Sequence, residues 1–297
     1  MQTALRLLVF PVMLVAALAA TALALGSGAE GSVAVLLIYV GMMPVVAGLE
    51  RVIPHRAEWN QRRGDLLADA LYMPTTWGVG ALLSPLFAAV AVAVAGALSR
   101  TTGSEPWPSE WPLAAQVALA CGVAEFFDYW GHRVLHRIPW LWRFHSIHHS
   151  AKRVYWLNAT RTHPGELLVR GLFGGVPLAV LGVGEPVFAY WMVLGRVAGL
   201  FQHANIDFAL GPFSWLFSIG DLHRWHHSRD RTEADRNYGN SFIFWDTAFG
   251  TRYLPSDREP PAEVGIANLD AFPTHFLDQL GAPFRFAAIE RASQKTP

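Results

Sequence analysis

The sequence predicts an all-helical integral membrane protein that carries a histidine-rich metal site at one membrane surface. Of its 297 residues, 52% are hydrophobic and only 15% are charged, which is too apolar for an ordinary soluble domain. Several apolar runs reach the roughly 20 residues that a helix needs to cross a bilayer, and most histidines gather in three short clusters. The formal net charge of zero does not favour nucleic-acid binding.

Apolar runs at 7–25, 32–48, 67–98 and 112–130 predict about four transmembrane helices. The first run resembles a secretory signal, but the spans that follow favour a retained anchor. A further stretch, 167–203, is interrupted at Gly184-Glu185-Pro186 and predicts a helical hairpin that enters the membrane and returns to the same side. An alternative topology divides 67–98 into two short helices and moves the later segments to the other side.

Loop charge predicts the orientation of these spans. Arg51, Arg56, Arg62 and Arg63 follow the second run, and an excess of basic residues marks the cytoplasmic side. The histidine clusters then lie in a cytoplasmic helical cap, and the short loops suit the inner membrane of a bacterium. We expect three parts: transmembrane helices at 1–111, a histidine-bearing domain at 112–253, and a C-terminal tail at 254–297.

The three clusters contain histidines spaced three or four residues apart, which places their side chains on one face of a helix. Imidazole is a common ligand of first-row metals, and eight imidazoles exceed what one ion needs, so the count predicts two metal ions. The single cysteine, Cys121, excludes a thiolate site built within the chain. The eight candidate ligands are His132, His136, His145, His148, His149, His223, His226 and His227.

Two further histidines lie at the feet of the predicted hairpin. His163 precedes the hairpin and His203 ends it, so both are expected to complete the ligand shell. For each, helix capping or hydrogen bonding to a ligand is the competing interpretation. His55 and His275 stand alone and are expected to be ordinary interfacial or surface residues.

A shell of neutral imidazoles leaves the charge of two cations to be offset by nearby anions, and a metal-bound histidine usually donates its second ring N–H to an acceptor. Asp128 precedes His132 by four residues and shares its helical face. Asp221 could serve as a helix cap instead. The four carboxylates predicted to support the ligands are Asp128, Asp221, Glu166 and Asp207.

The motifs Gly-His-Arg-Val-Leu-His, His-Ser-Ile-His-His and His-Arg-Trp-His-His, in this order, resemble those of the fatty acid hydroxylase/sterol desaturase superfamily. The flanking Asp128-Tyr-Trp, Thr162-His-Pro and Gln202-His-Ala-Asn stretches strengthen the resemblance, as does Asn237-Tyr-Gly-Asn before Phe244-Trp-Asp-Thr-Ala-Phe-Gly. The likeness extends over about 114–253, so 112–253 is expected to be a catalytic domain of this type.

The resemblance implies a non-haem di-iron centre, with zinc as a possible substitute in purified protein. Such a centre would use O2 to hydroxylate or desaturate a C–H bond of a sterol, fatty acyl, sphingoid, carotenoid or ether lipid. It would draw electrons from a donor such as ferredoxin or a cytochrome b5-type reductase. Some relatives carry a paired His-x-x-x-His where this chain has the single His203, with Gly199 and Asp207 four residues away. The tenth ligand is therefore expected to be His163, with Asn205 or water as alternatives.

The competing functional interpretation is a non-catalytic membrane protein that binds metal or haem. Ligands along a translocation path should lie within the spans, whereas these clusters lie at or beyond their cytoplasmic ends. Because imidazole must be neutral to bind a metal, we expect metal loss as the pH falls through about 6.

Overall fold

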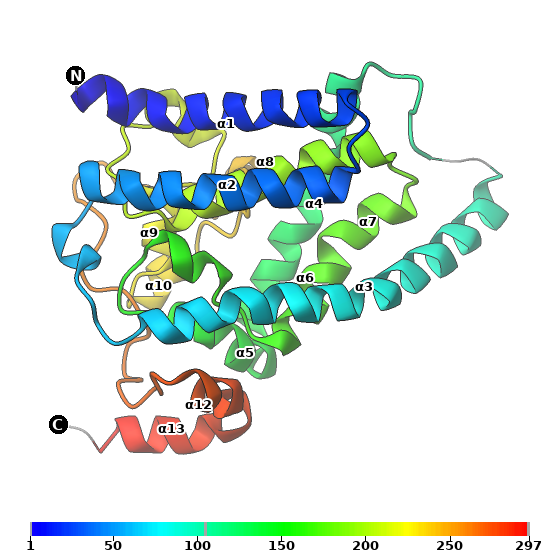
Figure 1. Ribbon diagram of the computed structural model, residues 1–297. Helices are drawn as coiled ribbons and strands as arrows, with labels where there is room; N and C mark the ends of the chain where they lie inside the picture. Colours follow the sequence, from blue (N-terminus) through cyan, green and yellow to red (C-terminus); the bar gives the residue numbers. More distant parts are fainter. Residues whose placement is uncertain (1, 104–105, 296–297) are drawn as a thin grey trace.

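The computed structural model describes residues 2–103 and 106–295 and is helical throughout (Figure 1). Within these ranges it contains isolated β-bridges but no strand. The predicted all-helical class is therefore confirmed. Positions 1, 104–105 and 296–297, which belong to the expected first part and the tail, lie outside the described residues.

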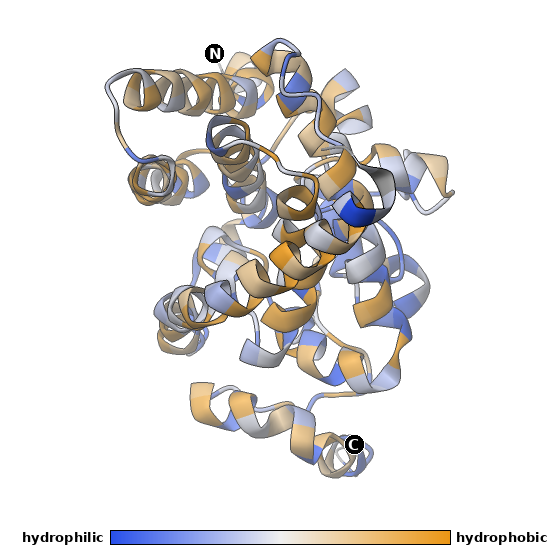
Figure 2. Ribbon diagram, turned by 90° about the vertical axis from the view of Figure 1, so that its right-hand side faces the viewer, coloured by the Kyte–Doolittle hydropathy of each residue, from blue (hydrophilic) through white to orange (hydrophobic). Residues whose placement is uncertain are grey.

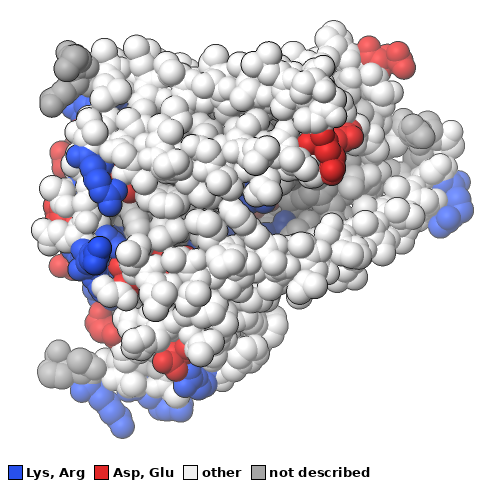
Figure 3. All heavy atoms as spheres, viewed as in Figure 1, with Lys and Arg blue, Asp and Glu red and all other residues white. Residues whose placement is uncertain are grey.

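The first three helices are α1 (Gln2–Gly26), α2 (Gly31–Val52) and α3 (Leu66–Thr102). All three are long and apolar enough to cross a membrane. Their outer faces expose large apolar side chains, including Leu23 (76%), Leu37 (66%) and Leu82 (80%), which suits contact with lipid. Figure 2 shows the long helices nearly end-on and mostly in hydrophobic colours, and in Figure 3 their outer surfaces carry little charge between their ends.

Helix α3 is continuous over 37 residues, so the alternative of two short helices is not observed. Its length of roughly 55 Å exceeds the ~30 Å of a bilayer core. Helix α4 (Leu113–Arg137) contains the fourth apolar run. Among the described residues, only α1, α2 and α3 meet the length and hydropathy of a membrane span, so the expected number of four stays a prediction.

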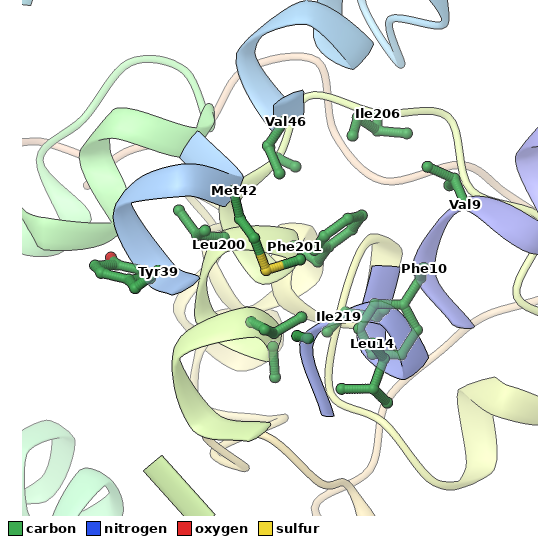
Figure 4. Close-up of a cluster of buried hydrophobic side chains, with 14 of the residues drawn as sticks. Val9, Phe10, Leu14, Tyr39, Met42, Val46, Leu200, Phe201, Ile206 and Ile219 are labelled. Carbon is green, nitrogen blue, oxygen red and sulfur yellow. The ribbon is translucent and has the colours of Figure 1, made fainter. Parts of the chain in front are cut away.

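The expected hairpin is formed by α6 (Pro164–Phe173), α7 (Gly175–Val180) and α8 (Glu185–His203). The chain turns before Glu185, as predicted, and it also breaks at Gly174, where a Cβ would come within 2.8 Å of the Arg170 carbonyl oxygen. Helix α8 packs against α1 and α2. Figure 4 shows Phe10 of α1, Met42 of α2 and Phe201 of α8 within one buried apolar cluster.

Short helices surround the end of α8, and the name cap is used for this group of helices. They are α5 (Pro139–His149), α9 (Asp221–His226), α10 (Arg231–Ala234) and α11 (Phe244–Ala248), with 3-10 turns η1 (Ala57–Asn60), η2 (Trp156–Thr160) and η3 (Gly211–Trp215). The tail forms α12 (Phe276–Gly281), η4 (Ala282–Arg285) and α13 (Phe286–Ser293). It packs against Tyr72 of α3 and Ile147 of α5, so it covers one side of the cap.

Candidate metal centre

Nine histidines from four helix ends converge into two adjacent groups of possible metal ligands. In each group the candidate ligand atoms lie within 4.8 Å of one another, and every one of these histidines is buried. We call the groups site A and site B. Site A contains His132, His136, His145, His149 and His226; site B contains His148, His203, His223 and His227.

Site A is assembled from the ends of α4, α5 and α9, and several of its histidines face one another through Nε2. The Nε2 atom of His132 lies 3.0 Å from that of His145 and 3.1 Å from that of His226. The Nε2 atoms of His149 and His145 are 3.2 Å apart. Ligand nitrogens at right angles around an ion, each at about 2.1 Å from it, are separated by about 3.0 Å. The spacing therefore fits a shared ion.

The tautomers in site A leave lone pairs facing each other. The Nδ1 atom of His132 lies 2.7 Å from the Tyr238 carbonyl oxygen, and that of His226 lies 2.7 Å from the Arg236 carbonyl oxygen. A carbonyl only accepts, so each Nδ1 carries the proton and each neutral ring has a bare Nε2. Two bare nitrogens 3.1 Å apart repel unless a cation lies between them. The buried Nε2 of His136 likewise has no partner among the described residues.

Site B is built from His148 at the end of α5, His203 at the end of α8, and two histidines of the third cluster. The Nε2 atom of His223 lies 2.8 Å from that of His203 and 3.0 Å from that of His227. The Nδ1 atom of His203 is 2.8 Å from the side-chain oxygen of Asn158, so this histidine also presents Nε2 to the site.

The two sites share a boundary. His148 of site B and His149 of site A are neighbours in sequence, and the stacked rings of His149 and His227 have centroids 4.5 Å apart. The arrangement can therefore hold two cations next to each other, the first by five imidazoles and the second by four.

Two carboxylates contact histidines of site A directly. Glu166 lies 2.9 Å from Nδ1 of His145, and Asp235 lies 3.1 Å from Nδ1 of His136. Burial would raise the pKa of Glu166, but its interactions with His145 and Arg170, both of which hydrogen-bond the carboxylate, outweigh burial and lower this pKa to about 2. Glu166 is therefore an anion that can offset metal charge at neutral pH.

The other three predicted supporting carboxylates do not hydrogen-bond a histidine in the described structure. Asp128 is half-buried beside Arg170 in a small pocket that His132 also lines. Asp221 pairs with Arg224 at 2.5 Å, and Gly220 rather than Asp221 occupies the N-cap position of α9. Asp207 pairs with Arg6 at 2.6 Å.

The structure places His163, the expected tenth ligand, outside both groups of histidines. Its Nδ1 atom accepts the backbone N–H of Gly165 and caps α6, and its Nε2 atom lies 3.1 Å from the Leu280 carbonyl oxygen. Asn205, the alternative tenth ligand, uses its side chain to bind Arg56 and Asn60. His55 and His275 also lie outside both sites.

Several supporting groups were not anticipated from sequence. They are Asp235, Asn158 and the backbone carbonyls of Tyr238, Arg236 and Arg161, the last of which lies 3.3 Å from Nδ1 of His148. The Tyr238 carbonyl that accepts from His132 belongs to a loop fixed by two buried carboxylates. Asp246 accepts the N–H groups of Tyr238 and Gly239, and Glu125 accepts that of Ser241. The Asn237-Tyr-Gly-Asn motif is the only sequence signal that pointed to this loop.

Burial keeps the histidines outside the helical spans neutral. Burial is the main reason why the pKa values of His132, His149 and His227 lie well below the usual range, and repulsion from neighbouring imidazoles lowers them further. Burial also lowers the pKa of His226 to about 3. Neutral imidazoles are the form that binds metals.

An open apolar pocket of about 590 Å³ lies apart from both sites. It is lined by residues of α1, α4 and α8, among them Leu18, Gly122 and Leu194, and by none of the nine histidines.

The fold and the site define an all-helical protein with three candidate membrane spans and two adjacent groups of histidines that could each hold a metal ion. The fatty acid hydroxylase family model matches residues 117–251. The chain belongs to this family, within the fatty acid hydroxylase/sterol desaturase superfamily.

Relatives in this family modify lipids. An ornithine lipid hydroxylase of Rhizobium tropici is 35% identical over 251 residues, which are 84% of this chain and 75% of that protein. A methylsterol monooxygenase of Arabidopsis thaliana is 33% identical over 50% of this chain and 56% of its own length. An alkylglycerol monooxygenase of Caenorhabditis elegans is 26% identical over 58% of this chain and 33% of its own length. No solved structure matches the chain.

Proposed function

We propose that this protein is a membrane-bound, non-haem di-iron oxidoreductase that uses O2 to hydroxylate a lipid C–H bond. The observation that carries the proposal is the pair of bare Nε2 atoms of His132 and His226, 3.1 Å apart in a buried site. A bound metal cation removes the repulsion between these two nitrogens. The names of the relatives, which are lipid hydroxylases and monooxygenases, support the reaction class.

Site A would hold one iron and site B the other, and zinc could replace either in purified protein. Iron held by imidazole without thiolate supplies O2 activation and cleavage of an unactivated C–H bond. The chain's own residues fix the ligands: Glu166 and Asp235 accept the Nδ1 protons of His145 and His136. Their negative charge offsets that of the ions. Burial of all nine rings keeps bulk water away from the reaction.

The first substrate to test is an ornithine lipid, because the relative that matches over most of both chains is named for that substrate. We place the catalytic domain at 112–253 and the metal sites at the cytoplasmic face of a bacterial inner membrane. Figure 3 supports this face, since Lys and Arg gather near one end of α1 and α2. The electron donor would be a ferredoxin or a cytochrome b5-type reductase. Desaturation begins with removal of the same hydrogen and is the alternative outcome.

The test is turnover by purified protein in lipid nanodiscs with ornithine lipid, reductant and isotopically labelled O2. We expect about two irons per chain and a product that has gained one labelled oxygen atom. His226→Ala should lose iron and product, whereas His275→Ala, outside both sites, should keep both. Protein that carries no transition metal would contradict the proposal. Iron-loaded protein that oxidises no lipid would favour the non-catalytic alternative.

A further inference from the structure

Arg196 is a charged residue placed among the apolar membrane helices. It belongs to α8, and its guanidinium lies over the Tyr39 ring of α2, 5.7 Å from the ring centroid. Tyr39 in turn faces Trp77 of α3, with ring centroids 6.0 Å apart. Tyr39 lies near the middle of α2, and both α2 and α3 are candidate membrane spans. The guanidinium therefore lies at the depth of the middle of α2, which is a candidate membrane span.

No acidic side chain in the described part of the protein forms an ion pair with Arg196, which is exposed. The other arginine of the hairpin, Arg170, pairs with Glu166 at 2.5 Å. A charge at membrane depth is costly and typically marks a functional site. The Tyr39 ring offsets only part of this cost. The charge of Arg196 is therefore expected to be balanced by an anion from outside the chain.

Arg196 and the site B ligand His203 lie on the same face of α8. They are seven residues apart, which corresponds to two helical turns and roughly 10 Å along the axis. Gly199 lies between them on this face, and a Cβ there would meet no atom within 4 Å. An open strip therefore runs from the guanidinium toward site B. Tyr190 and Leu194, which line the apolar pocket, lie on the opposite face.

The Arg196 end of this strip borders α2 and α3, because Arg196 contacts Tyr39 of α2 and Tyr39 faces Trp77 of α3. Figure 3 shows a hollow between these two helices, with Lys or Arg atoms on its floor. A lipid could enter the hollow sideways from the bilayer with its head group leading.

We propose that Arg196 binds the carboxylate of an amino-acid lipid and so holds the head group on the open strip of α8, within reach of site B. The planar guanidinium matches a carboxylate through two parallel hydrogen bonds. Gly199 leaves the room that the head group needs. The inference rests on the proposed function and adds the group by which the substrate is recognised.

The test compares two ligands and three variants in metal-loaded protein. The ligands are an N-acyl ornithine lipid and its carboxyl methyl ester, each bound to protein in phosphatidylcholine nanodiscs and quantified by native mass spectrometry. We expect wild type to prefer the acid over the ester by on the order of ten-fold or more. Arg196→Gln should abolish this preference, and Arg196→Lys should retain part of it. Gly199→Leu should weaken the binding of both ligands. Gly122→Leu, on the α4 wall of the apolar pocket, should bind them as wild type does.

Equal binding of acid and ester by wild type would overturn the inference, as would an acid preference that survives in Arg196→Gln. Phosphatidylglycerol that competes as well as the ornithine lipid would indicate a phosphate site and would also overturn it. Turnover is measured separately. An Arg196-dependent preference without lipid oxidation refutes the proposed function alone, and oxidation without that preference refutes this inference alone.

Discussion

At the scale of single residues, Glu166 links the metal centre to the guanidinium of Arg170. Its carboxylate accepts hydrogen bonds from His145 and from Arg170, and its side chain is fully buried. An acceptor behind a metal-bound histidine fixes the ring and makes it a stronger ligand. Replacing the carboxylate by an amide keeps the shape and removes the charge.

Glu166→Gln is therefore expected to weaken iron binding at site A by roughly 10- to 100-fold. Iron retained after titration with a chelator measures the effect. Asp207→Asn is the matched control, because Asp207 pairs with Arg6 and touches no histidine. If both variants lost iron equally, Glu166 would have no special role in the site.

The structure places His163 away from both candidate sites, although the sequence favoured it as a ligand. It stands in a motif beside the hairpin, yet both ring nitrogens are used in capping α6 and in contacting the tail. His149, by contrast, faces only other imidazoles and aromatic rings. Local sequence does not reveal whether a buried ring faces a carbonyl or another imidazole.

His163→Asn should keep the iron content of the wild type, because asparagine is also a good N-cap. His149→Asn should lose most of the iron of site A. Metal analysis after gel filtration distinguishes the two. A His163→Asn variant that remains folded but loses half of its iron would restore His163 as a ligand.

At the scale of elements, helical periodicity and apolar length predicted α1, α2 and α3 and the two limbs of the hairpin. They did not predict how closely α4 and α6 approach each other. A Cβ at Gly131 would lie 2.7 Å from the Cβ of Phe173, so glycine is required at this crossing, one residue before His132. At Gly122 of the same helix, a Cβ would meet nothing within 4 Å.

These two glycines give a matched pair of variants. Gly131→Ala should separate α6 from α4 and destabilise the protein by about 1–3 kcal/mol, lowering its thermal midpoint. Gly122→Ala should stabilise by about 0.5–1 kcal/mol, since alanine favours helix over glycine. Thermal unfolding in one detergent compares them. A Gly131→Ala protein as stable as wild type would show that the two helices can move apart freely.

At the scale of the whole molecule, the histidine motifs predicted that distant segments converge, because ligands of one centre must meet. They did not predict the division into five and four ligands. That division depends on where α5 ends: His148 turns to site B and His149 to site A. Nor could the sequence show that Asp235 supports His136, since this contact joins segments 99 residues apart.

Burying a cluster of neutral imidazoles makes the fold sensitive to acid. The pKa of His226 falls from 6.5 to about 3 on burial, and that of other ligands falls well below 6.5. Between these values the unfolded chain binds protons that the folded chain does not, so stability decreases as the pH falls below about 6.5. Each such histidine contributes roughly 1.4 kcal/mol per pH unit. With a bound metal, stability should also decrease as the pH falls, because metal binding requires neutral rings.

We therefore expect the thermal midpoint to drop steeply between about pH 7 and pH 5, with iron released as the protein unfolds. Circular dichroism and metal analysis on the same samples would follow both events. His275→Gln, outside both sites, should show the pH dependence of wild type, whereas His149→Phe should show a shallower one. Iron that leaves near pH 6 while the protein remains folded would mean that the rings become protonated in the native state, against the effect of their burial.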